Sequence, residues 1–117
     1  MRRLAVICCV GASLSLQACG RASETQFQSA LEEAGRLMTY SRDREAAGLR
    51  EIDRAKPADA CPDFRAAAIR ADGAVNVMRQ AGHPDAAWAE AQGWGRQLAA
   101  ATAQRDAMLM RARQTCG

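Results

Sequence analysis

The side chains with the most chemical potential in this chain are five cysteines and a single histidine. His83 lies in a Gly-His-Pro turn, and a serine nucleophile would need it as a base. No Gly-x-Ser-x-Gly motif is present, so a Ser/His/Asp triad is not expected. Glu32 and Glu33 are adjacent, so on a helix they point about 100° apart and form a solvated face rather than a catalytic carboxylate pair. We therefore expect no catalytic site and no enzyme activity.

Metal and cofactor sites are not predicted either. A zinc site needs three or four convergent ligands, and His83 is the only histidine. The chain has no Cys-x-x-Cys-His motif for covalent haem and no glycine-rich phosphate loop. Met108 and Met110 suggest copper, but two residues apart on a helix they diverge by about 200°. We expect these methionines in the core or at its rim, with no metal and no cofactor.

The N-terminal segment has the organisation of a bacterial export signal. Arg2 and Arg3 precede an apolar stretch from Leu4 to Leu16. This stretch is too short to span a membrane, because spanning needs about 20 apolar residues, but it has the length of a signal-peptide core. It closes with a motif that resembles the lipobox of bacterial lipoproteins: Leu16, Gln17, Ala18 and Cys19.

In that class of protein the cysteine thiol receives a diacylglycerol, the chain is cut just before it, and the new amino group is acylated. The resemblance implies that residues 1–18 are a signal peptide, that Cys19 carries acyl chains such as palmitate, and that residues 19–23 are a short tether. Several acyl chains give stable anchoring, at about 0.8 kcal/mol per buried methylene. Gly20 resembles the outer-membrane sorting pattern, so we expect an envelope protein anchored in the outer membrane and facing the periplasm. Simple secretion and an uncleaved anchor are the alternatives.

The cysteine count then favours one disulfide. Cys8 and Cys9 leave with the signal peptide and Cys19 carries the lipid, so Cys61 and Cys116 remain as an even pair in an oxidising compartment. A redox-active pair is the alternative, but the chain has no Cys-x-x-Cys motif. A structural disulfide is therefore predicted.

Cleavage would also change the charge balance. Without Arg2 and Arg3, 14 basic residues face 13 acidic ones, and the net charge falls from +3 to about +1. The arginines of residues 42–54 alternate with acidic residues, which is typical of a solvated helix face. No block of basic residues remains of the kind that binds nucleic acid, so no nucleic-acid partner is expected.

The first helix is predicted to begin at about Glu24. Ser23 and Gln26 have the spacing of a capping box. The apolar residues that follow have helical spacing and define the core face: Phe27, Leu31, Ala34 and Met38, then Leu49, Ile52 and Ala55.

The second helix is predicted to begin at Pro62, because Pro57 and Pro62 bound a break over residues 58–61 and proline fits the first turn of a helix. It ends at the turn Gly82, His83, Pro84. Its core stripe is Phe64, Ala68, Ala71, Val75 and Met78, flanked by Ile69 and Val77.

The third helical segment begins at Asp85 and carries Leu98, Leu109 and Ala112. An uninterrupted helix to Thr115 would overshoot its neighbour by roughly 16 Å, so that Cys116 could not meet Cys61. We therefore predict a break over Gly93 to Gly95, with the helix resuming at Arg96 and ending at Thr115. Trp88 and Trp94 are expected to pack near the turn.

The fold class predicted is all-α, a small alanine-rich bundle of three main helices in one domain, residues 24–117. The expected function is that of a membrane-anchored envelope lipoprotein acting as a structural or protein-interaction module. Its partner is expected to be another envelope protein, with Trp88 and Trp94 as candidate contacts. The alternative is an accessory lipoprotein that binds a small ligand or metal in a cavity near Trp88, Trp94 and His83.

Overall fold

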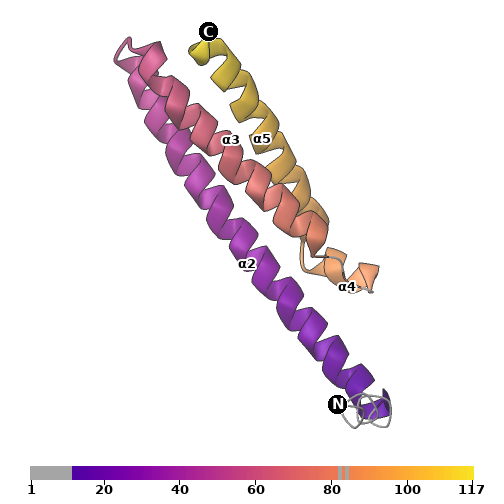
Figure 1. Cartoon of the computed structure of the whole chain (residues 1–117). Helices are drawn as coiled ribbons and strands as arrows, with labels where there is room; N and C mark the ends of the chain where they lie inside the picture. Colours follow the sequence, from indigo (N-terminus) through magenta and orange to yellow (C-terminus); the bar gives the residue numbers. More distant parts are fainter. Residues whose placement is uncertain (1–11, 82, 84) are drawn as a thin grey trace.

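The chain folds into helices connected by short turns. The computed structural model describes residues 12–81, 83 and 85–117, with side chains from Glu24 onward. Its elements are α2 (Ala12–Asp53), α3 (Pro57–Gln80), α4 (Ala86–Ala91) and α5 (Trp94–Cys116), with no strand among these residues (Figure 1). The all-α class with three main helices is confirmed. None of the described helices has a stretch long and apolar enough to cross a membrane. Residues 1–11 of the predicted signal peptide, with Cys8 and Cys9, lie outside the described part.

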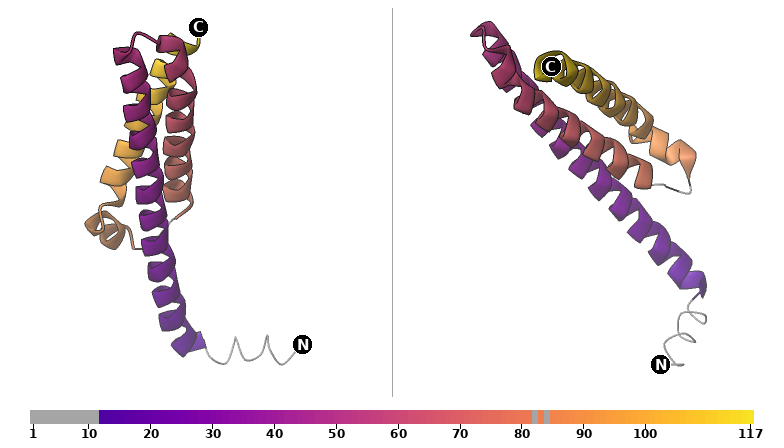
Figure 2. Two further views of the ribbon diagram at one scale, coloured as in Figure 1. Left: turned by 90° about the vertical axis from the view of Figure 1, so that its left-hand side faces the viewer. Right: turned by 45° about the horizontal axis from the view of Figure 1, so that its top comes forward.

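Helix α3 is the centre of the arrangement. It packs along both α2 and α5, whereas α2 and α5 contact each other much less. Neighbouring helices run antiparallel, and α2 extends past the end of α3 toward the N-terminus (Figures 1 and 2). The core therefore consists of two apolar clusters that both include residues of α3.

The predicted start of the first helix is wrong. α2 runs without interruption from Ala12 to Asp53, so residues 19–23 are helical and Ser23 lies inside the helix. A Ser-x-x-Gln sequence caps a helix only where the preceding chain leaves the helical conformation. The residues before Ser23 are mostly good helix formers such as alanine, leucine, glutamine and arginine, so the helix continues through them.

The core face of α2 is confirmed in its first half and wrong in its second. Four predicted residues are buried: Phe27, Leu31, Ala34 and Met38. Leu49 and Ile52 are instead 36% and 38% exposed. The same face of the helix continues through Ser41 and Gly48, which follow the 4,3 spacing without a shift. Ser41 is fully buried and its hydroxyl donates a hydrogen bond to the Ala67 carbonyl at 2.7 Å.

Small residues on this face let α2 and α3 approach closely. At Gly48 a Cβ atom would lie 2.7 Å from Cε1 of Phe64, which is closer than real Cβ contacts. The ring of Phe64 thus occupies the space that a side chain at position 48 would fill. Phe64 itself is completely buried.

The turn between α2 and α3 is shorter than predicted. The Lys56 N–H donates to the Glu51 carbonyl at 2.9 Å, and Ala55 has φ 60°, which together form a Schellman-type helix end. α3 then begins at Pro57, and Pro62 lies inside the helix. The predicted break over residues 58–61 is wrong because the hydrogen bond that Pro62 cannot donate would end at Ala58, and both residues are exposed, so water can satisfy the free carbonyl.

The apolar stripe of α3 is confirmed: Phe64, Ala68, Ala71, Val75 and Met78 are all buried. The break in the third segment is confirmed as well. The Asp85 carboxylate caps α4 by accepting a hydrogen bond from the Trp88 N–H at 3.0 Å, and Gly93 has φ 84° before α5 begins. α5 starts at Trp94 rather than Arg96 and ends at Cys116 rather than Thr115.

The break makes the two paired helices nearly equal in length, since α3 has 24 residues and α5 has 23. The Cys61–Cys116 disulfide is confirmed, with 5.0 Å between the Cα atoms. On α5, Met108 and Ala112 are buried, but Leu109 is 43% exposed. Leu109, one of the apolar residues noted on this segment, lies at the surface because Met108 occupies the position that faces α3.

Candidate functional site: an apolar groove between α3 and α5

The described surface has an apolar groove between α3 and α5. It has a volume of about 430 Å³ and is lined by Arg65, Ala68, Ile69, Asp72, Arg105, Leu109 and Ala112. Two aliphatic side chains stand out from it: Ile69 is 68% exposed and Leu109 is 43% exposed. The chain has few large apolar residues, so two of them side by side at the surface mark this face as a candidate binding site.

The spacing of residues on each helix builds the groove. On α3, Arg65, Ile69 and Asp72 are separated by four and three positions, so they form a stripe along one side of the helix. On α5, Arg105, Leu109 and Ala112 have the same separations. The floor is formed by Ala68 and Ala112, whose small side chains are buried and leave a hollow beside the protruding Ile69.

The two ends of the groove differ in charge. At one end Arg105 Nη1 lies 3.5 Å from Asp72 Oδ1, and Arg105 Nε donates to Asp106 Oδ1 at 3.1 Å. At the other end stands Arg65, which is exposed and forms no ion pair with any residue that the structure describes. The groove thus has an apolar middle, a paired acidic and basic end, and a basic end.

The seam between α2 and α5 is bridged by polar side chains instead. Gln104 Nε2 donates to Ser41 Oγ at 3.3 Å and to Glu45 Oε1 at 3.2 Å. Nearer the α4 end, Gln28 Nε2 donates to Gln92 Oε1 at 3.0 Å. These long side chains satisfy one another's hydrogen-bonding groups across the seam. The polar seam is therefore less suited to an apolar partner than the groove between α3 and α5.

The predicted contact residues Trp88 and Trp94 are both partly buried and lie in different surroundings. Trp88 belongs to an aromatic cluster in which its ring is 4.4 Å from His83 and 5.4 Å from Phe27, measured between centroids. Trp94 Nε1 donates to the Met78 carbonyl at 2.9 Å. Both tryptophans pack against the core, so packing within the chain accounts for much of their surface.

His83 is held in place by the turn that contains it. Its Nδ1 accepts a hydrogen bond from the Asp85 N–H at 3.0 Å. Its ring packs against Phe27 as well as Trp88. The structure therefore brings His83 and Trp88 together, as the ligand alternative requires, but places Trp94 elsewhere.

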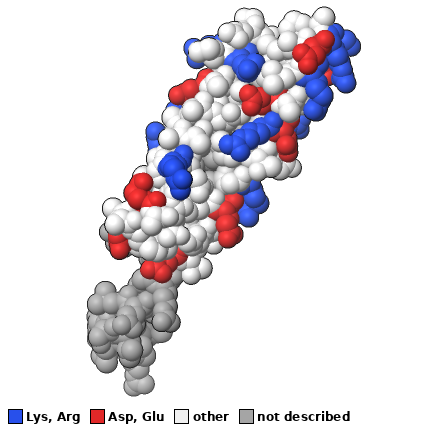
Figure 3. Space-filling model, turned by 180° about the vertical axis from the view of Figure 1, so that it is seen from behind, with Lys and Arg blue, Asp and Glu red and all other residues white. Residues whose placement is uncertain are grey.

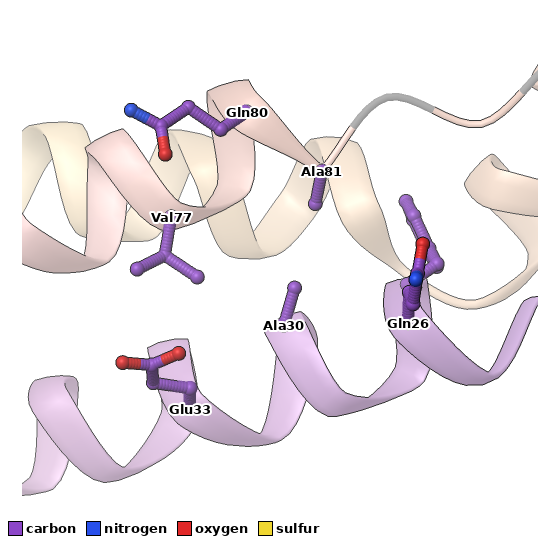
Figure 4. Close-up of a pocket in the computed structure, with 7 residues that line it drawn as sticks. Gln26, Ala30, Glu33, Val77, Gln80 and Ala81 are labelled. Atoms are coloured by element: carbon purple, nitrogen blue, oxygen red, sulfur yellow. The ribbon is translucent and has the colours of Figure 1, made fainter. Parts of the chain in front are cut away.

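A second, more polar hollow of about 330 Å³ lies between α2 and the end of α3. Figure 4 shows that the side chains of Ala30 and Val77 project into the space between the two helices and that the Glu33 carboxylate lies on the α2 side. Phe27 also lines this hollow, which places it next to the aromatic cluster. Its lining includes the polar side chains of Gln26, Glu33 and Gln80.

The acidic residues and methionines considered in the sequence differ in their exposure. Glu32 and Glu33 are both exposed on α2, Met108 is buried, and Met110 is 58% exposed. Among the described residues no group of histidine, cysteine and acidic side chains could hold a metal ion. The backbone at Cys19 is part of α2, but its side chain lies outside the described part.

The helical spacing of α3 places Ile69 beside the core stripe, but it does not indicate the groove. The disulfide could have indicated the groove, because joining Cys61 to Cys116 fixes the register of the two antiparallel helices. In that register Ile69 is level with Met108, and Arg105 is level with Asp72. The ion pair between Arg105 and Asp72 agrees with this alignment.

Fold and groove together define a disulfide-closed bundle of three long helices with an exposed apolar seam. Comparisons of the chain with protein-family models, with curated proteins and with solved structures find no match.

Proposed function

We propose that this chain is a lipid-anchored protein of the bacterial cell envelope and that it acts as a protein-interaction module. The groove between α3 and α5 is its contact surface. The observation that carries the proposal is the exposure of Ile69 and Leu109 over a floor of alanines, flanked by charged side chains. An apolar centre with a polar rim is the usual anatomy of a protein contact surface.

The lipobox-like sequence supports the anchor. Cys19 precedes Phe27, the first core residue of α2, by eight positions, which is about 12 Å along a helix. The backbone between them is helical, so the lipid site and the bundle are joined without a flexible segment. An acylated Cys19 would keep the bundle close to the membrane surface.

Charge supports acyl chains, rather than basic residues, as the means of attachment. Acidic side chains are frequent at the end of the described bundle next to the N-terminal segment (Figure 3). The exposed acidic residues of the first half of α2 and of α4 with its cap are Glu24, Glu32, Glu33, Asp85 and Glu90. Because an acidic surface is not attracted to anionic lipid head groups, the acyl chains must supply the membrane affinity.

Intact-mass spectrometry of the protein isolated from bacterial membranes tests the anchor. We expect a chain that begins at Cys19, carries acyl groups, and gains the mass of two hydrogens on reduction, because only one disulfide opens. The control is Cys19→Ser, which is expected to lack the acyl groups. An unacylated N-terminus, or a free thiol at Cys61 or Cys116, would contradict this part of the proposal.

The interaction surface is tested by a photo-crosslinking amino acid placed at Ile69 in cells. We expect a covalent protein adduct from position 69, because this side chain lies at the centre of the contact surface. The matched control is position 110, since Met110 is 58% exposed, close to the 68% of Ile69, but does not line the groove. Equal adducts from both positions, or none from position 69, would contradict the interaction function.

A further inference from the structure

We propose that the occupant of this groove is a second copy of the same chain, related to the first by a twofold axis that crosses the helices. In this arrangement α3 of one copy lies antiparallel on α3 of the other. The inference rests on the proposed function, because it assigns a partner to the surface named there. It follows from the shape and the charge of the groove.

The shape is self-complementary. Ile69 protrudes, and its neighbour Ala68 lies in the hollow that continues to Ala112. The midpoint of the stripe from Arg65 to Asp72 falls between residues 68 and 69. A twofold axis at this midpoint places Ile69 of each copy over Ala68 of the other, so the same protrusion and hollow fit twice. Such reciprocal contacts are the defining property of a twofold interface.

The charges are also self-complementary about the same midpoint. Arg65 precedes Ile69 by four positions and Asp72 follows it by three. Reversal of the helix direction therefore places Arg65 opposite Asp72 of the second copy, and Asp72 opposite Arg65. This gives Arg65 an acidic partner that it lacks among the described residues of its own chain.

A twofold axis parallel to the helices is less favourable. It would place α3 opposite α5 of the second copy, with residues of equal height facing each other. Asp72 would then face Arg105, but Arg65 would face Ala112 and the neighbouring Arg113, with no acidic residue. Only the antiparallel arrangement gives Arg65 an acidic partner, while Arg105 keeps its ion pairs with Asp72 and Asp106 of its own chain, so we favour it over the parallel one.

Charge-reversal substitutions at Arg65 and Asp72, made in two differently tagged full-length copies of the chain, test this proposal. The two copies are produced together, extracted from membranes in mild detergent, and purified through the first tag, and the recovery of the second tag is measured. We expect wild-type copies to be recovered together. When both copies carry Arg65→Asp, or both carry Asp72→Arg, like charges face each other and recovery falls at least about tenfold.

One copy with Arg65→Asp and one with Asp72→Arg are expected to restore recovery, because each altered residue then faces an opposite charge. The matched control is Arg70→Asp in both copies, which makes the same change on α3 outside the groove and leaves recovery unchanged. Circular dichroism of each variant checks that the helices are retained.

The proposal is overturned if wild-type copies are not recovered together, if both single variants behave as wild type, or if the mixed pair is not restored. If Asp72→Arg alone lowers recovery and mixing does not restore it, the parallel arrangement is indicated instead. Failure of self-association together with a position-69 adduct to a different protein would overturn this inference but leave the interaction function in place.

Discussion

Reduction of the Cys61–Cys116 disulfide is expected to lower the free energy of unfolding by about 4 kcal/mol, on the chain-entropy estimate for a loop of 55 residues. The effect is large for this chain because its core is thin. Many of its buried residues are alanines, which remove little apolar surface from water. The bond also holds the end of α5 against the start of α3, where the buried groups are Ala60, Phe64 and Ala112.

The measurement is thermal and chemical unfolding followed by helical circular dichroism, with and without reductant. Cys61→Ser is expected to reproduce the effect of reduction. The matched control is the double variant Cys61→Ser, Cys116→Ser, whose melting should not respond to reductant at all. Melting of the wild-type chain that is unchanged by reductant would show that packing alone holds α5 in place.

Replacement of Phe64 by alanine is expected to lower the free energy of unfolding by about 3 to 5 kcal/mol, the usual cost of removing a buried aromatic ring. Phe64 is fully buried between α2 and α5, with its ring against Gly48 and the Arg111 guanidinium 5.6 Å from the ring centroid. Its loss would leave a cavity where three helices meet. Denaturant unfolding of the wild-type and variant chains measures the change.

Two glycines of α2 provide the controls for this site. Gly48→Ala is expected to destabilise the wild-type chain by about 1 to 3 kcal/mol, because the new Cβ collides with Phe64. In the Phe64→Ala background the same change should cost less or stabilise, since the space is then free. Gly35→Ala has nothing within 4 Å of its Cβ and should stabilise by up to about 1 kcal/mol. Equal effects of the two glycine changes, or an additive double variant, would show that Phe64 does not set the helix separation.

The parts of the fold that depend on local chemistry and on length were predictable. The stripe of α3 has an unbroken helical spacing, and only one face of the helix can carry it. The break at Gly93 followed from a length argument, since two helices joined at both ends must match in length. The disulfide was predicted because the expected signal peptide and the expected lipid on Cys19 leave Cys61 and Cys116 as one pair.

The errors arise where the surroundings of a residue decide whether its local signal is used. Leu49 and Ile52 are apolar, but the close approach of Phe64 to Gly48 places the seam of α2 elsewhere. Pro62 can break a helix, yet at an exposed position it does not. The capping box at Ser23 has no effect where the preceding residues are themselves helical.

The candidate groove was the least predictable feature. It is formed by residues from α3 and α5 that are about 40 positions apart, so neither stripe indicates a site on its own. The register of the two helices had to be known first. Trp88 and Trp94 were predicted as contacts because they lie near the turn and the glycine break, but both pack against the core of their own chain.

The disulfide also divides the long helices into two topological groups. Together with the turn between α3 and α4, it makes the backbone from Cys61 to Cys116 a closed covalent ring, and α3 and α5 cannot separate while the sulfurs stay joined. α2 lies outside this ring and is linked to it only through the turn at residues 54–56 and the first residues of α3. A mechanical load between the proposed acyl anchor at Cys19 and a proposed partner held by the ring would therefore be carried by helix packing, because α2 can separate from α3 and α5 without the rupture of any covalent bond.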